Sequence, residues 1–151
     1  MRHFHRLAVA AEAIADYKGP MSIVYRETHD VDLEQLAHLF TCADMGDRAV
    51  DRARLAQQVS GSMFVVSAWD GGRLVGFARA ISDGVTNAYI STVAVLPQYR
   101  RQGIGREMMR RLLAGRDGIT FALHSRKEAK DFYVECGFLE TADMFRRLRK
   151  Y

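Results

Sequence analysis

Cysteine is scarce in this sequence, and its two cysteines, Cys42 and Cys136, are far apart. They lie in no spacing that is typical of a metal site, so we expect no zinc or other metal ion. Disulfides are typical of oxidising compartments. Two isolated cysteines instead suggest free thiols in a reducing cytoplasm, and we expect a cytoplasmic protein.

Long apolar runs are also missing. A membrane helix needs about 20 consecutive apolar residues, and no segment approaches that length. The basic N-terminus precedes an apolar stretch, Leu7–Ala11, as in a signal peptide, but Glu12 and Asp16 interrupt it. We therefore expect neither export nor membrane association. Gly19-Pro20 indicates a boundary, which predicts an extension over residues 1–20 and one functional domain over residues 21–151.

What the sequence does have is the composition of one ordinary globular domain. Its 151 residues, of which 48% are hydrophobic and 26% charged, suffice for a single core. The formal charge of +4 is compatible with an anionic partner, either a nucleotide cofactor or a nucleic acid. Charge alone does not choose between the two.

The spacing of apolar residues predicts an α/β domain with the element order β-α-α-β-β-β-α-β-α-β. Strands are expected at Ser22–Glu27, Met63–Trp69, Arg73–Ile81, Ala88–Val95, Ile119–Leu123 and Met144–Leu148. Helices are expected after a cap at Asp30 or Asp32, over Arg48–Val59, from Gly103 to Asp117-Gly118, and over Lys127–Cys136. The unit from Tyr89 to Leu123 indicates a parallel crossover, so the sheet is mixed.

The segment with most chemical content is the turn between a strand and a helix that contains Gly103 and Gly105. The first N–H groups of a helix have no intrahelical acceptor, and the helix dipole adds partial positive charge there. Arg100, Arg101 and Arg106 add full charges. Together these features suit a pyrophosphate group.

Two common nucleotide motifs do not fit this turn. A Rossmann fingerprint needs a third glycine where Met108 stands. A P-loop needs Gly-Lys-Ser/Thr, whereas Arg106-Glu107 follows Gly105 here.

A more specific resemblance comes from the whole segment. Arg100-x-x-Gly103-x-Gly105, preceded by Val-Ala-Val-Leu-Pro-Gln-Tyr, resembles the acetyl-CoA-binding motif of the GCN5-related N-acetyltransferase (GNAT) family. Ala129-Lys-Asp-Phe-Tyr-Val-Glu-Cys-Gly-Phe138 resembles a later helix of that family. The resemblance spans Ser22 to Arg149. It implies a GNAT fold with six to seven strands, in which the fourth and fifth strands, Ala88–Val95 and Ile119–His124, splay apart.

The resemblance also implies the roles of individual residues. Those expected to contact acetyl-CoA are Val93, Ala94, Val95, Arg100, Arg101, Gln102, Gly103, Ile104, Gly105, Arg106 and Arg126. Tyr133 is expected to protonate the departing CoA thiolate, and the N–H of Val93 to stabilise the developing oxyanion.

The general base stays open. Some family members have a glutamate and a nearby asparagine at positions where this sequence has Phe121 and Arg126. His124 is the best residue type nearby, because a histidine titrates near neutrality. Asp83 or a chain of water molecules is the alternative.

The acceptor is expected to be a small primary amine. The stretch from Gly76 to Gly84 resembles a subgroup that includes arylalkylamine-type and serotonin-type acetyltransferases. Candidate residues for the acceptor side of the cleft are Met45, Asp47, Trp69, Arg79, Ser82, Asp83, Asn87 and Tyr89. Many relatives pair through their last strands, so a homodimer through Met144–Leu148 is also an expectation.

Three alternatives stay open. The chain is either an enzyme or a non-catalytic acyl-CoA sensor, and an enzyme of this kind acts on a small amine or on a protein amine. The basic helix Arg100–Arg116 suggests a nucleic-acid-binding module, but aromatic residues are not interleaved with its arginines as a stacking platform requires. We therefore expect no nucleic-acid partner.

Overall fold

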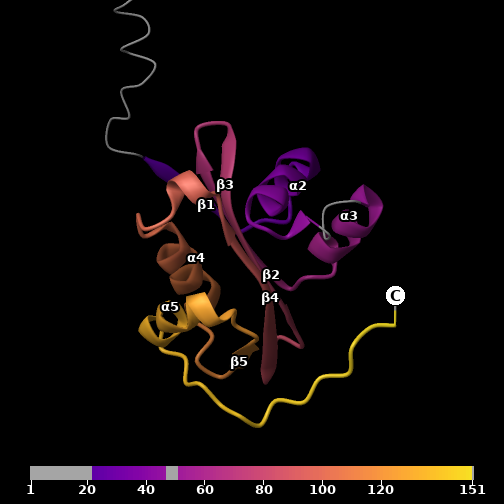
Figure 1. Ribbon diagram of the computed structural model, residues 1–151, viewed down its shortest axis with the longest axis vertical. Helices are drawn as coiled ribbons and strands as arrows, with labels where there is room; N and C mark the ends of the chain where they lie inside the picture. Colours follow the sequence, from indigo (N-terminus) through magenta and orange to yellow (C-terminus); the bar gives the residue numbers. More distant parts are fainter. Residues whose placement is uncertain (1–21, 47–50, 151) are drawn as a thin grey trace, which may run out of the picture.

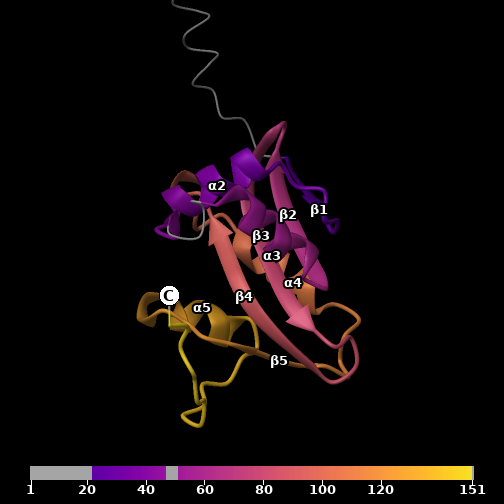
Figure 2. The same cartoon turned by 90° about the vertical axis from the view of Figure 1, so that its right-hand side faces the viewer.

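The computed structural model describes residues 22–46 and 51–150. Within them the chain forms a five-stranded sheet in the order β1-β2-β3-β4-β5 (Figures 1 and 2). The strands are β1 (Ile23–Arg26), β2 (Phe64–Asp70), β3 (Arg73–Ser82), β4 (Asn87–Val95) and β5 (Thr120–Leu123). The pairs β1-β2, β2-β3 and β3-β4 are antiparallel, and β5 is parallel to β4. The predicted α/β class and the parallel crossover are confirmed.

Helices cover both faces of this sheet. In Figure 1, α2 (Leu33–Cys42) and α3 (Arg52–Ser60) lie on one side of it, and α4 (Ile104–Leu113) and α5 (Lys130–Glu135) on the other. On the first side Phe40 of α2 packs edge-on against Phe77 of β3, with ring centroids 6.0 Å apart. On the other side Met108 of α4 lies so close to Gly76 of β3 that an added Cβ would stand 3.0 Å from the methionine Cε. The central strands are therefore buried from both faces.

Side-chain caps explain where α2 and α3 begin. The carboxylate of Asp32 accepts hydrogen bonds from the N–H groups of Glu34 and Gln35, at 2.9 and 3.0 Å. Asp51 accepts one from the N–H of Arg54 at 3.1 Å. Such bonds satisfy donors that a helix leaves unpaired at its first turn. Asp32 is thus the cap of α2, and Asp51 is the cap of α3. Arg48, where this helix was expected to begin, lies outside the described residues.

The helix after the glycine turn ends earlier than predicted, at Leu113. Gly115 adopts a positive φ of 72°, a conformation that leaves the helix and that glycine tolerates readily. The guanidinium of Arg116 then donates to the carbonyls of Arg111, Leu112 and Ala114, at 3.1, 2.9 and 3.3 Å. These bonds satisfy carbonyl groups at the end of the helix. The apolar pattern alone does not reveal where the helix ends.

The predicted last strand, Met144–Leu148, is wrong. The described residues form no strand after β5, and the sheet has five strands rather than six to seven. The reason is that apolar residues form a strand only beside a partner strand and a core. Here the segment leaves the sheet, with Leu139, Phe145 and Leu148 exposed by 88%, 97% and 72%. It crosses below β5 towards α3 (Figure 1, yellow). The homodimer stays a prediction, and the expected extension over residues 1–20 lies outside the described residues.

Candidate active site

The site begins where β4 and β5 separate. The two strands pair in parallel from Asn87 with Thr120 to Ile90 with Leu123, and β5 ends there. β4 continues to Val95. Among the described residues, the edge of β4 that faces β5 therefore has no strand beside it from Ser91 onward. This agrees with the predicted splay. Val93 and Val95 are half-buried on this stretch, while the Ala94 side chain is buried.

An irregularity in β4 lies at the start of the separation. Arg79 of β3 pairs with Thr92 and Ala80 with Ile90, so Ser91 is an extra residue in β4. A bulge of this kind bends the strand and redirects its side chains.

The predicted anion-binding turn follows β4 directly. A short 3-10 turn at Pro97–Tyr99 connects β4 to residues 100–103, and α4 begins at Ile104. Arg101 and Gly103 have φ values of 61° and 82°. Five residues of the turn are exposed, namely Arg100, Arg101, Gln102, Gly103 and Arg106. Ile104 is only 2% exposed, so its side chain belongs to the core and only its backbone faces the turn.

The two sequence motifs are packed against each other. Gly105 lies against Phe132 of α5, and an added Cβ would stand 3.3 Å from Cζ of that ring. Arg106 donates to the carboxylate of Glu135 at 2.6 Å, although both side chains are well exposed. Surface ion pairs contribute little stability. The apolar contact at Gly105 therefore holds α5 beside the turn more firmly than this ion pair does.

Tyr133 is half-buried on α5 between two aromatic rings. Its centroid lies 5.0 Å from that of Phe132 and 6.1 Å from that of Phe138, both edge-on. Burial raises the pKa of the Tyr133 hydroxyl above its usual 10.0, and the nearby Cys136 adds to this effect. A phenol with a raised pKa keeps its proton at neutral pH. Tyr133 can therefore donate a proton.

The remaining residues predicted near the reaction lie where β5 ends. His124 is exposed directly after that strand. Arg126 donates from Nη2 to the carbonyl of Asp44 at 3.0 Å, which joins this end to the segment after α2. The structure thus gives Arg126 a protein partner that the sequence did not suggest. Its role toward the cofactor stays a prediction.

Asp83 is poorly suited to act as the base. Its carboxylate holds the turn between β3 and β4, accepting from the Thr86 hydroxyl at 2.7 Å and from the N–H groups of Val85 and Thr86, both at 2.8 Å. These bonds, the Thr86 hydroxyl first, lower the pKa of Asp83 far below its usual value. A carboxylate that is stabilised in this way accepts a proton poorly.

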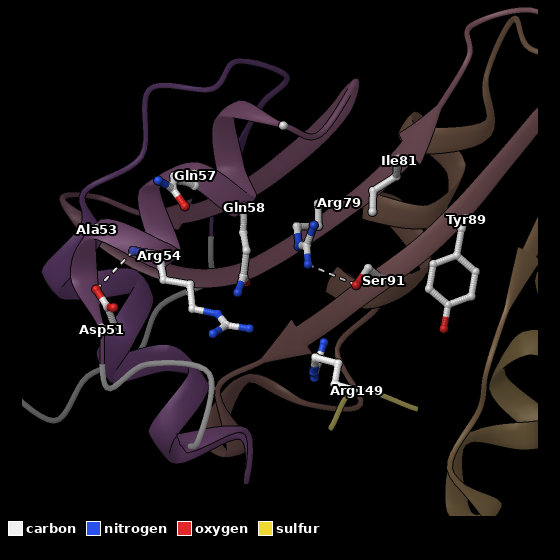
Figure 3. Close-up of a pocket in the computed structure, with 11 residues that line it drawn as sticks. Asp51, Ala53, Arg54, Gln57, Gln58, Arg79, Ile81, Tyr89, Ser91 and Arg149 are labelled. Atoms are coloured by element: carbon white, nitrogen blue, oxygen red, sulfur yellow. Dashed lines mark hydrogen bonds between the residues drawn. The ribbon is translucent and has the colours of Figure 1, made fainter. Parts of the chain in front are cut away.

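A cavity of about 850 Å³ lies on the α3 side of the sheet (Figure 3). Its walls come from α3, β3, β4 and the C-terminal segment, and Ser91 at the bulge is part of them. Two of the predicted acceptor residues, Arg79 and Tyr89, line it.

Other predicted acceptor residues have structural roles instead. Trp69 is buried and donates to the Ser67 hydroxyl at 2.8 Å, with the Arg26 guanidinium 4.6 Å from the centroid of its ring. Ser82, like Asp83, holds the β3-β4 turn, as its hydroxyl donates to the Asn87 carbonyl at 2.8 Å. Met45 packs against the core. Asp47 lies outside the described residues.

Sequence reasoning missed most of the polar wall of the cavity, which includes Arg54, Gln57, Gln58 and Arg149. The available signal was the composition of α3, where only Leu55 and Val59 are buried, so most of its surface is polar. That pattern does not tell a ligand-facing surface from a solvated one.

Comparison with known proteins identifies the family. The family model described as "Acetyltransferase (GNAT) domain" matches residues 28–147. The chain therefore belongs to the GNAT family, as its two motifs and the splayed sheet indicated. Proteins of this family use acetyl-CoA as a co-substrate.

Individual relatives agree with this assignment. The chain is 32% identical to GCN5-related N-acetyltransferase 1, chloroplastic, from Arabidopsis thaliana, over 80% of its own length and 63% of that protein. It is also 32% identical to Serotonin N-acetyltransferase 2, chloroplastic, from Oryza sativa subsp. japonica, over 85% of its length and 66% of that protein. The chain thus spans just under two thirds of these relatives. A GNAT acetyltransferase of Streptococcus pneumoniae TIGR4 shares the fold with a TM-score of 0.68 and 26% identity, over 85% of this chain and all of that one.

Two features of the described residues bear on metal binding and on membranes. In residues 22–46 and 51–150, no group of three or more histidine, cysteine, aspartate or glutamate side chains is placed to hold a metal ion. Over the same residues, no helix has both the length and the apolar character that spanning a bilayer requires. The two relatives are named as chloroplastic proteins, and the cytoplasmic location expected from the cysteines stays a prediction.

Proposed function

We propose that this chain transfers the acetyl group of acetyl-CoA to a primary amine. The observation that carries the proposal is the position of the anion-binding turn relative to the splay. β4 loses its neighbour after Ile90 and leads within one short turn to the N-terminus of α4. An extended ligand has its thioester at one end and its pyrophosphate further along. Such a ligand would meet the free backbone edge of β4 with its thioester end and the anion-binding turn with its pyrophosphate.

The turn has the chemistry that a pyrophosphate requires. A side chain added at Gly103 would meet no atom within 4 Å, so the backbone there is open to a ligand. The first N–H groups of α4 face this space without intrahelical acceptors. We assign cofactor binding to residues 100–106, with Arg100, Arg101 and Arg106 supplying charge. Val93, Ala94 and Val95 offer backbone groups to the pantetheine arm.

Acyl transfer then needs three contributions from the protein: a donor to the developing oxyanion, an acid for the leaving thiolate and a base for the amine. The N–H of Val93 donates to the thioester oxygen, which gains negative charge when the amine attacks the carbonyl carbon. A C–N bond forms and the C–S bond breaks. Tyr133 gives its hydroxyl proton to the CoA thiolate, and its partial burial keeps that proton in place beforehand.

The attacking amine must also lose a proton. We assign this step to His124, because it is exposed where β5 parts from β4 and a histidine accepts protons near neutral pH. If a histidine is the base, the rate of transfer should fall on the acidic side of the pH profile, because a protonated histidine cannot accept a proton. This fall should disappear in His124→Ala. An unchanged profile would exclude His124 and leave a water chain as the base.

Two measurements test the function itself. At a hundredfold excess over its dissociation constant, acetyl-CoA should stabilise the fold by about 2.7 kcal/mol. For a domain of this size, that raises the thermal midpoint by about 5–10 °C. Arg106→Gln should reduce the shift, whereas Arg110→Gln, one turn further along α4, is the matched control. Thiol release from acetyl-CoA in the presence of primary amines then measures transfer.

The outcomes separate the proposal from its alternatives. No thermal shift at saturating acetyl-CoA would contradict cofactor binding. A normal shift with no thiol release from any amine would indicate an acyl-CoA sensor. Release with peptide amines but not with small amines would indicate a protein acceptor.

A further inference from the structure

The cavity on the α3 side is lined by three arginines from three separate parts of the chain. Arg54 comes from α3, Arg79 from β3 and Arg149 from the C-terminal segment. In Figure 3 their side chains, together with the amide of Gln58, are directed toward the same space. Residues far apart in sequence thus bring guanidinium groups into one cavity.

Arg79 is the fixed member of this group. Its side chain is buried, and it donates to the hydroxyl oxygens of Thr92 at 3.2 Å, Ser62 at 3.3 Å and Ser91 at 3.0 Å. Ser91 is the extra residue of the irregularity in β4, and Thr92 follows it. The guanidinium is therefore held at the point where β4 begins to part from β5, next to the proposed site of acetyl transfer.

The charge of the wall is strongly one-sided. Of the described residues that line the cavity, three are arginines and one, Asp51, is a carboxylate. That carboxylate already accepts the N–H of Arg54 as the cap of α3. Like charges gathered in one cavity repel one another, and a ligand of opposite charge relieves that repulsion. Guanidinium groups are also the side chains best suited to bind carboxylate or phosphate through paired hydrogen bonds.

The size of the cavity narrows the kind of ligand. A volume of about 850 Å³ lies within the range of small-molecule sites. Ile81 and Tyr89 add apolar surface, and Gln57 and Gln58 add amide donors. This combination fits a small organic anion.

We propose that the acceptor is a small amine that carries an anionic group, a carboxylate or a phosphate, and that Arg54 and Arg149 bind this group in the cavity beside the buried Arg79. The inference rests on the proposed acetyl transfer and specifies its substrate class. It narrows the small primary amine expected from the sequence to one with an anionic group, because an arylalkylamine without such a group offers the arginines no partner of opposite charge.

The test compares amines that carry an anionic group with counterparts that lack it. Tyrosine is paired with tyrosinamide, 5-aminopentanoate with 5-aminopentanamide, and phosphoethanolamine with ethanolamine. The first two pairs report on a carboxylate and the third on a phosphate. For each compound, kcat/KM for thiol release and the Kd for the protein are measured separately, so that binding is read without transfer.

The arginine variants have matched controls on the same segments. Arg54→Gln is compared with Arg52→Gln, which lies on α3 but outside the cavity and pairs with Glu34. Arg149→Gln is compared with Arg147→Gln in the C-terminal segment. The wild type should use the anionic member of at least one pair about tenfold better, the effect of one charge-assisted hydrogen bond. Arg54→Gln and Arg149→Gln should remove that preference, and the two controls should keep it.

The outcomes distinguish this inference from the function on which it rests. Equal or better use of the neutral amines, with Arg54→Gln behaving like Arg52→Gln, would overturn the inference while acetyl transfer stands. Arginine-dependent binding of the anionic compounds without thiol release would support the anion site and contradict the transfer function. Neither binding nor preference in any pair would also overturn the inference.

Discussion

Phe132 of α5 lies directly against Gly105 of α4, so that a Cβ on Gly105 would stand 3.3 Å from Cζ of the ring and 3.4 Å from Cε2. This contact joins the proposed cofactor turn to the helix that carries Tyr133. A side chain at position 105 therefore acts on two parts of the site at once.

Gly105→Ala should reduce activity through Phe132. The ring must move by a few tenths of an ångström, and Tyr133 follows it in the chain. Because misplacement of about 1 Å can cost a hundredfold in rate, we expect a loss of about three- to tenfold in kcat for thiol release. Phe132→Leu in the same protein should restore part of the rate by making room. Equal losses with and without Phe132→Leu would contradict this coupling, and Gly72→Ala, where nothing lies within 4 Å, is the control.

Tyr133→Phe should lower kcat by about a hundredfold, the usual contribution of a general acid, with little change in the KM for acetyl-CoA. Burial raises the pKa of this hydroxyl above 10.0. The wild-type rate should therefore not decline on its alkaline side until the pH exceeds about 10. Tyr25→Phe, on β1, is the control, because burial also raises the pKa of Tyr25. A kcat that survives Tyr133→Phe would assign the proton to another donor.

Arg126→Gln tests whether this residue binds the cofactor or only holds the segment after α2. It donates to the Asp44 carbonyl at 3.0 Å, between residues that are 82 positions apart in sequence. Loss of the bond should lower stability by about 1 kcal/mol, measured by urea unfolding. If Arg126 also contacts acetyl-CoA, the Kd for acetyl-CoA should rise by about tenfold, and more at low salt. An unchanged Kd with reduced stability would remove Arg126 from the cofactor site.

Glu107 should make the fold sensitive to acid. Hydrogen bonds from Arg110 and then Arg111, with their charges, lower its pKa from 4.5 to about 2. As the pH falls, the carboxylate of Glu107 therefore binds a proton in the unfolded chain at a higher pH than in the folded chain. The stabilisation is complete above about pH 4.5 and is lost as the pH falls towards 2. In Glu107→Gln this part of the pH dependence should disappear from the urea midpoint, whereas Glu128→Gln, which alters an exposed residue, should keep it.

Local signals in the sequence determined much of the fold. The alternation of apolar and polar residues and the glycines around residue 104 predicted the first five strands and the order of the helices. These features depend on neighbouring residues, so they can be read without tertiary information. The same segments carried the resemblance to the GNAT family and led to the turn and Tyr133.

Only the tertiary structure decided the contacts between distant segments. The failure of Met144–Leu148 to form a strand depends on whether a partner edge is available. The arginine-lined cavity is the clearest case. Arg54, Arg79 and Arg149 are separate surface-type residues in the sequence, and only the packing of α3, β3 and the C-terminal segment places their charges in one space.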